Sequence, residues 1–169
     1  MAKDYLNELG EGMVDPKEID WTDYRFSVPA KIYGELCICF EWDFPISEIT
    51  SILKLQPHCA QRYADTRVNP FEGKHNPGYW EYRSKIVSDF GCELAAQELQ
   101  DVLTTHWKEL QIVKEQYQPS DIFIRIYAEI EGEADYPAIR IPNSLMKYVV
   151  ELEADIDIVL SNNYCSAKH

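Results

Sequence analysis

The sequence predicts an α+β fold, with a mostly antiparallel sheet of about five strands and three helices packed on one face. Two kinds of pattern support this prediction. Several segments alternate apolar and polar residues, as half-buried strands do, and others repeat apolar residues at helical spacing. The segments occur in the order β-α-β-α-β-β-α-β, without strict alternation, so the sheet is expected to contain ferredoxin-like split β-α-β elements.

The N-terminal half supplies a strand, a helix and a second strand. Apolar and polar residues alternate over 32–41, which predicts a half-buried strand. The segment I-S-E-I-T-S-I-L at 46–53 places its isoleucines on one helical face. Pro57 ends this helix, since a proline disfavours helical geometry at the residue before it. The aromatic segment Y-W-E-Y-R-S-K at 79–85 predicts the next strand.

The C-terminal half opens with one long amphipathic helix, expected over 92–110. The clearest strand is 121–131, D-I-F-I-R-I-Y-A-E-I-E, because all its even-numbered positions are apolar. A turn over 132–135 and a short strand over 136–141 are expected next. The remaining elements are a helix over 142–153 and a closing strand over 155–160.

The domain organisation follows from these elements. Residues 1–30 are acidic, with scattered apolar residues interrupted by glycine and proline, which is typical of a partly ordered extension. Residues 31–164 form a single α+β domain, and 165–169 are a tail. A chain of 169 residues is long enough to bury a substantial core within one such domain.

Composition restricts the partners and the compartment. The formal net charge of −13 repels phosphate backbones, so we expect no nucleic-acid partner and favour a basic protein. The N-terminus lacks the apolar segment of a signal peptide, and no apolar run is long enough to span a bilayer, so we expect no membrane association. Five cysteines without a framework spacing are typical of reduced thiols in a cytoplasmic protein.

The segment 54–85 differs from the rest of the chain because it holds six lysines and arginines against three acids. Much of it, 56–78, is expected to be a loop without secondary structure of its own, and such loops are often functional or disordered. Its basic side chains are candidates for binding a carboxylate or phosphate. These candidates are His58, Arg62, Arg67, Lys74 and His75. The plainer interpretation, which we favour, is that these bases pair with acids on the surrounding surface.

Metal and catalytic sites have little support in the sequence. His58, Cys59 and His75 offer donor atoms but lack the spacing of a zinc site, so no metal or other cofactor is expected. Cys37 and Cys39 lie two apart on a strand and share one face, where packed or half-exposed thiols are expected. Nucleophile elbows, Walker loops and paired catalytic carboxylates do not occur, so we expect no catalytic residues.

An ordered series of segments resembles a bacterial family of unknown function, DUF4279. The series includes I-S-E-I-T-S-I-L-K-L-Q-P, N-P-G-Y-W-E-Y-R-S, I-F-I-R-I-Y and I-R-I-P-N-S-L-M-K-Y-V-V-E-L-E-A, and spans roughly 32–164. The family usually shows a glycine-containing basic segment after the proline that ends the first helix. Here C-A-Q-R-Y-A-D-T-R keeps the arginines without the glycine. The resemblance implies a small intracellular domain without an established activity.

Two functions from different classes remain as hypotheses. The first is a non-enzymatic cytoplasmic domain that binds a protein, in its sharpest form an immunity-type protein that neutralises a basic bacterial toxin. The second is a small-molecule or anion-binding domain, or an unrecognised enzyme, that uses the basic loop 56–78. The net charge and the missing catalytic motifs favour the first hypothesis.

Overall fold

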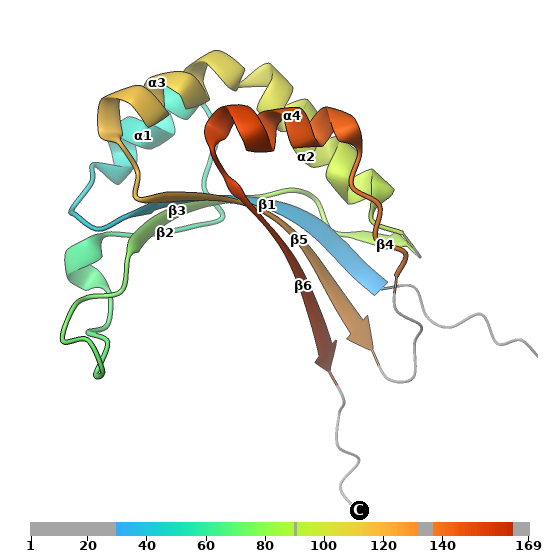
Figure 1. Ribbon diagram of the computed structural model, residues 1–169, viewed down its shortest axis with the longest axis horizontal. Helices are drawn as coiled ribbons and strands as arrows, with labels where there is room; N and C mark the ends of the chain where they lie inside the picture. The colour runs from blue at the N-terminus through green and yellow to red at the C-terminus, as the bar shows by residue number, and fades with distance from the viewer. Residues whose placement is uncertain (1–29, 90, 132–136, 164–169) are drawn as a thin grey trace, which may run out of the picture.

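The structure is a computed structural model that describes residues 30–89, 91–131 and 137–163. Within these residues it is an α+β domain in which six strands form one mixed sheet and four helices cover one face of it (Figure 1). The strands are β1 (Ala30–Phe40), β2 (Cys59–Gln61), β3 (Gly78–Arg83), β4 (Val87–Asp89), β5 (Asp121–Glu131) and β6 (Asp155–Asn163). The helices are α1 (Ile46–Leu53), α2 (Glu93–Thr105), α3 (Trp107–Tyr117) and α4 (Asn143–Leu152), and a short 3-10 turn, η1, spans Tyr63–Asp65.

The strand order in the sheet is β2-β3-β1-β5-β6, and β4 also pairs with β1. All pairs are antiparallel except β5 and β6, which are parallel and joined through α4. β1 and β2 both run antiparallel to β3, which lies between them, so β1-α1-β2 is a split β-α-β unit. The β5-α4-β6 unit is not split, because its strands are direct neighbours.

The hydrophobic core lies between the helices and the sheet. Leu36 on β1 and Ile124 on β5 are fully buried, and Leu99 of α2 is buried with them. Gly34 makes this close packing possible, because a Cβ atom at this position would lie 3.0 Å from Leu99 Cβ and 3.2 Å from the Ala95 carbonyl oxygen. The even-numbered residues of β1 and β5 therefore face the helices. The odd-numbered ones lie on the opposite side of the sheet, called the open face below.

The sheet and helix numbers correct the sequence prediction. Six strands replace the expected five, because β2 and β4 have three residues each and show no alternation that predicts them. Four helices replace three, because the helix expected over 92–110 breaks at His106, whose backbone (φ −107°, ψ 19°) is not helical. The break turns the chain so that α3 packs against α1. The sheet is mostly antiparallel, as predicted, and the β5–β6 pair makes it mixed.

The segment after β5 differs from prediction in another way. The expected strand over 136–141 is reduced, in the part that is described, to one bridge between Gly91 and Ala138. The Cys92 N–H donates to the Ala138 carbonyl oxygen there, at 3.1 Å. The expected turn over 132–135 lies outside the described residues, as do the tail 165–169 and the extension 1–30 apart from Ala30. No described helix is long and apolar enough to cross a membrane.

Candidate functional site

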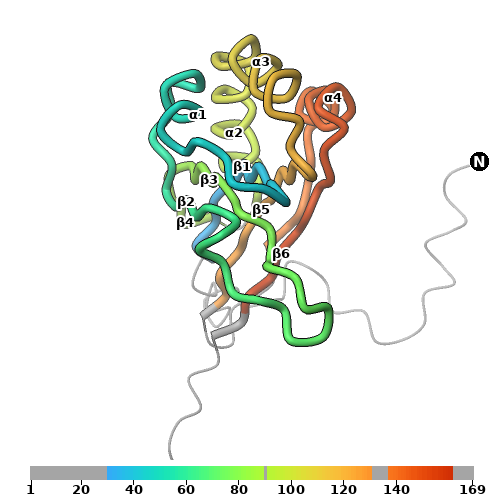
Figure 2. The backbone as a smooth tube through the Cα atoms, turned by 90° about the vertical axis from the view of Figure 1, so that its left-hand side faces the viewer, coloured from blue at the N-terminus to red at the C-terminus, as the bar shows by residue number. Residues whose placement is uncertain are grey.

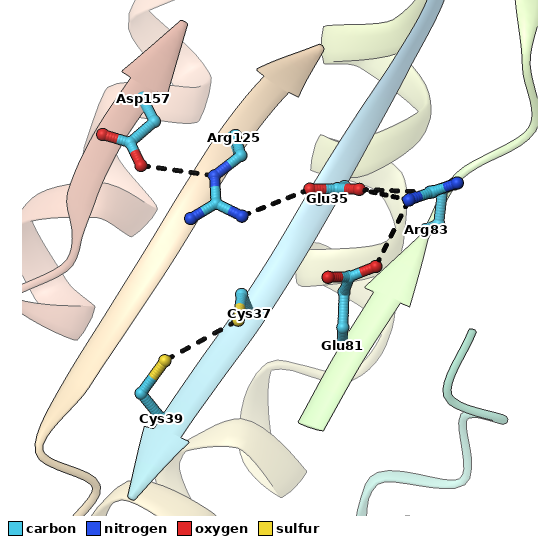
Figure 3. Close-up of polar contacts among 7 residues, drawn as sticks. All are labelled: Glu35, Cys37, Cys39, Glu81, Arg83, Arg125 and Asp157. Carbon is cyan, nitrogen blue, oxygen red and sulfur yellow. Dashed lines mark hydrogen bonds and ion pairs between the residues drawn. The ribbon is translucent and has the colours of Figure 1, made fainter. Parts of the chain in front are cut away.

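Charged side chains cross four strands on the open face (Figure 3). Glu35 of β1 stands directly opposite Arg83 of β3 on one side and Arg125 of β5 on the other. Arg125 in turn stands opposite Asp157 of β6. Side chains directly opposite each other in neighbouring strands are close enough to interact. The strand register therefore aligns these charges, and Arg83 also reaches Glu81 on its own strand.

The contacts in this row are charge-assisted hydrogen bonds. Arg83 donates from Nη2 and Nε to Glu35 Oε1, at 2.8 and 3.1 Å. Arg125 donates from Nη1 to Glu35 Oε2 at 3.4 Å and from Nε to Asp157 Oδ2 at 3.2 Å. Glu35 is only 3% exposed, so the two arginines replace the water that would otherwise solvate its charge. Burial, together with the nearby Glu35 charge, raises the pKa of Glu81.

Aromatic rings extend the row toward one end of β1. The Tyr33 ring stacks on the Tyr127 ring, with 4.9 Å between centroids and 11° between planes. The Arg83 guanidinium also lies over the Tyr33 ring, 4.3 Å from its centroid. Tyr33 is 4% exposed, and this burial raises its pKa to about 12. The middle of the open face is therefore covered by its own side chains.

The thiols of Cys37 and Cys39 lie next to this row, with their sulfurs 3.7 Å apart (Figure 3). Cys37 is 5% exposed and Cys39 is half-buried. The hydrogen bond between the two sulfurs and burial raise the pKa of the Cys37 thiol, whereas the bond from Cys37 lowers the pKa of Cys39. The described residues hold no group of three or more His, Cys, Asp or Glu side chains placed to bind a metal ion.

A hairpin projects from the other end of the sheet, between η1 and β3 (Figures 1 and 2). We call residues 66–76 the tip hairpin. Its base is closed by the buried Thr66, whose hydroxyl lies 2.6 Å from the Asn76 carbonyl oxygen. Its turn is closed by Asn69, whose N–H donates to the Lys74 carbonyl at 2.6 Å and whose side chain accepts from the Phe71 N–H at 3.0 Å.

The apolar side chains of the tip hairpin point to solvent. Phe71 is 96% exposed, and Val68 is 52% exposed. Gly73 follows with φ +66°, the left-handed conformation that glycine adopts without strain, and completes the turn. The Phe71 ring is therefore exposed to solvent on a turn whose backbone is fixed by hydrogen bonds.

A comparison with known protein families gives one match. A family model described as a domain of unknown function (DUF4279) matches residues 30–163. The chain belongs to the DUF4279 family. No curated protein and no solved structure matches. The part of the chain that matches the DUF4279 model contains the tip hairpin and the charged row of the open face.

Within this DUF4279 domain the five predicted site residues are spread along 58–75. His58 is exposed, and its backbone N–H donates to the Glu81 carbonyl oxygen at 2.7 Å. Arg62 lines a shallow depression of about 620 Å³ beside the start of α1, and its Nε lies 2.9 Å from Asp65 Oδ2. The plainer interpretation of ion pairing thus applies to Arg62.

The other three candidates belong to the tip hairpin. Arg67 and Lys74 are both exposed. The His75 ring packs 5.3 Å from the Tyr63 ring, and its Nδ1 lies 2.9 Å from the Thr66 carbonyl oxygen. A carbonyl only accepts, so His75 Nδ1 donates this hydrogen bond. The prediction that 56–78 is a loop without secondary structure is wrong, because this segment contains β2, η1 and the bridge between Val68 and His75.

Sequence reasoning missed Phe71 and the partners of Glu35 in the DUF4279 domain. Phe71 had a signal, since a proline precedes it and a glycine follows two residues later, which marks an exposed turn. Glu35 and Arg125 stood at polar positions of their strands, so their shared face was predictable. The contact between Glu35 and Arg125 was not predictable, because the alternation within each strand does not give the register between two strands far apart in the chain.

Proposed function

We propose that the protein is a non-enzymatic cytoplasmic domain that binds another protein through the tip hairpin. The observation that carries this proposal is the 96% exposure of Phe71 on a backbone closed by hydrogen bonds. Aromatic residues that fill a pocket on the partner dominate the energetics of many protein interfaces. A loop fixed before binding also loses little conformational freedom on association. The tip hairpin offers an exposed aromatic ring on such a loop.

The charged row of the open face supports a binding domain rather than an enzyme. Each of the two arginines contacts Glu35, at distances of 2.8 to 3.4 Å. These contacts engage both oxygens of the buried carboxylate and leave the row with a structural role. In this proposal, recognition is assigned to the exposed hairpin and to the long-range field of the acidic chain.

The net charge of −13 indicates the kind of partner. Opposite net charge accelerates the encounter of two proteins and suppresses contacts with acidic competitors. A basic protein with an apolar pocket that accepts Phe71 fits both features. Neutralisation of a basic bacterial toxin by an immunity-type protein is the most specific form of this proposal.

Affinity capture from the native host tests the proposal. The wild-type chain is compared with Phe71→Ala and with the control Val150→Ala, which shortens a side chain that is 72% exposed on α4. We expect a basic protein to be captured by the wild type and by the control but lost with Phe71→Ala. Capture of the same protein by all three chains contradicts the assignment to the tip hairpin. Capture of no basic protein at low salt contradicts the function itself.

Anion binding by the basic residues of 56–78 is a second candidate function. It is favoured by the position of Arg62 at the depression beside the first turn of α1, where Ser47 also lines the surface. Backbone N–H groups at the start of a helix attract anions, and arginine binds carboxylates and phosphates with two parallel hydrogen bonds. The ion pair with Asp65 competes with such a ligand, because it occupies the same guanidinium.

A further inference from the structure

The two cysteines of β1 form a close pair that neither proposed function uses. Their sulfurs are 3.7 Å apart on the open face, and Cys39 is partly accessible to solvent. Most neighbouring thiols in folded proteins are explained by packing or by disulfide formation. The position of this pair within the sheet decides which chemistry is open to it.

The strand geometry opposes a disulfide. Positions two apart on an extended strand repeat at about 6.7 Å. A disulfide requires Cβ atoms about 3.5–4.5 Å apart, so β1 would have to bend for one to form. β1 is held on both sides at these positions, because Cys37 pairs with Glu81 and Phe123, and Cys39 pairs with Tyr79 and Asp121. The central strand therefore keeps the two sulfurs close but unbonded.

A metal ion bound between the two sulfurs does not require the strand to bend, as a disulfide would. With metal–sulfur bonds of about 2.3 Å, two thiolates on one ion lie between about 3.8 Å apart in tetrahedral geometry and about 4.6 Å apart in linear geometry. The observed 3.7 Å is just below this range, and a linear two-coordinate ion requires its long end, so the two sulfurs must move apart by about 0.9 Å, which side-chain rotation allows. The backbone of β1 stays in place.

The ligand set selects the ion. Structural zinc requires four ligands, and the described residues supply no cluster of three metal-binding side chains. Two thiolates alone suit a soft ion of low coordination number, and Cu(I) is the biological ion of this kind. The complex carries one negative charge, which the nearby Arg125 favours and which the Glu81 and Asp121 carboxylates oppose.

We propose that Cys37 and Cys39 bind one Cu(I) ion as a two-coordinate dithiolate on the open face. Binding releases the two thiol protons: two Cys–SH groups and Cu(I) give a Cys–S–Cu–S–Cys anion and two H⁺. No electron is transferred, so no oxidant is needed. The copper–sulfur bonds replace the hydrogen bond that now joins the two sulfurs.

Anaerobic competition with the bicinchoninate complex of Cu(I) tests the site on the full chain. The background is the variant Cys59→Ser, Cys165→Ser, which leaves the proposed pair and the fully buried Cys92 in place. We expect one equivalent of Cu(I) per chain to move to this protein, and X-ray absorption to show two sulfur neighbours. Copper that stays with the chelator overturns the proposal, as does half an equivalent per chain, which places the ion between two chains.

Substitution of each cysteine locates the site. Adding Cys37→Ser or Cys39→Ser to this background is expected to abolish the transfer, and a circular dichroism spectrum like that of the parent shows that the fold is kept. Cys39 is half-buried and serine has nearly its shape, so Cys39→Ser decides the question if Cys37→Ser does not fold. Unchanged transfer to the folded Cys39→Ser variant overturns the proposal.

Discussion

Glu35 and Arg125 stand directly opposite each other on the central pair of strands, and Arg125 Nη1 lies 3.4 Å from Glu35 Oε2. Arg83 binds the other oxygen of the same carboxylate from β3. A carboxylate that is 3% exposed thus joins three strands through its two oxygens. A buried charge is costly without its partners, so substituting one residue at a time measures how much these ion pairs stabilise the fold.

Removing the acid should destabilise the fold more than removing the exposed end of the row. Glu35→Ala leaves two arginines facing each other, and we expect a loss of about 3 kcal/mol in the free energy of unfolding. Asp157→Asn, at a side chain that is 42% exposed, should cost less than about 1 kcal/mol. Urea unfolding at neutral pH measures both values. Equal losses would show that burial does not set the strength of these pairs.

Alkaline pH should weaken the fold through Tyr33, whose pKa rises to about 12 on burial. The unfolded chain loses this proton near pH 10, so between pH 10 and 12 the folded state binds more protons and stability falls as pH rises. The loss of stability reaches about 3 kcal/mol above pH 12, and it is zero below pH 9. Unfolding curves of the wild type and of Tyr33→Phe, taken at several pH values, isolate the contribution of Tyr33 to stability. Parallel pH profiles of the two proteins contradict the assignment.

Gly34→Ala should destabilise the domain by about 1–3 kcal/mol, because the new methyl group lies 3.0 Å from Leu99 Cβ. The control is Gly73→Asn on the tip hairpin, where no atom lies within 4 Å and asparagine tolerates the positive φ. Leu99→Ala removes Leu99 Cδ2, which would lie 3.1 Å from the new methyl group, so adding it to Gly34→Ala should give a smaller combined loss than the sum of the single losses. Thermal unfolding of the four variants measures this, and strict additivity would rule out the contact with Cδ2.

The anion-binding hypothesis makes its own prediction. If the basic residues of 56–78 bind an anion, Arg62→Ala, Arg67→Ala should lose the thermal stabilisation that an anionic metabolite gives to the wild type. The control, Lys85→Ala, Lys108→Ala, removes the same charge at two exposed positions outside 56–78. This control should keep the thermal stabilisation by the anion. A panel of anionic metabolites in thermal melts provides the measurement. A wild type that no member of the panel stabilises removes the hypothesis.

The sequence was most informative where one side of an element is buried. The alternation over 121–131 located β5 to the residue, and the helical spacing over 46–53 located α1. Both patterns arise from contact with a single core, so they are present in the local sequence. The fold class and the placement of all helices on one face followed from these segments.

What was missed depends on contacts between distant segments. β2 has three residues and exists because β3 offers it an edge. His106 carries no breaker signal, and the helix ends there because α3 must turn toward α1. The five predicted basic residues were chosen by charge along the chain, whereas the exposure of Phe71 depends on how the tip hairpin is closed. Charge is visible in a sequence and hairpin closure is not.

The central position of β1 has a consequence for synthesis of the chain. β1 is the first described strand, yet its longest pairing is with β5, and the two residues that join them lie 90 positions apart. During translation this apolar strand leaves the ribosome long before β5 does, so one of its edges has no partner for most of that time. Pairings of such sequence separation also form slowly in a free chain. The domain should therefore depend most on chaperones while residues 41–120 are being made.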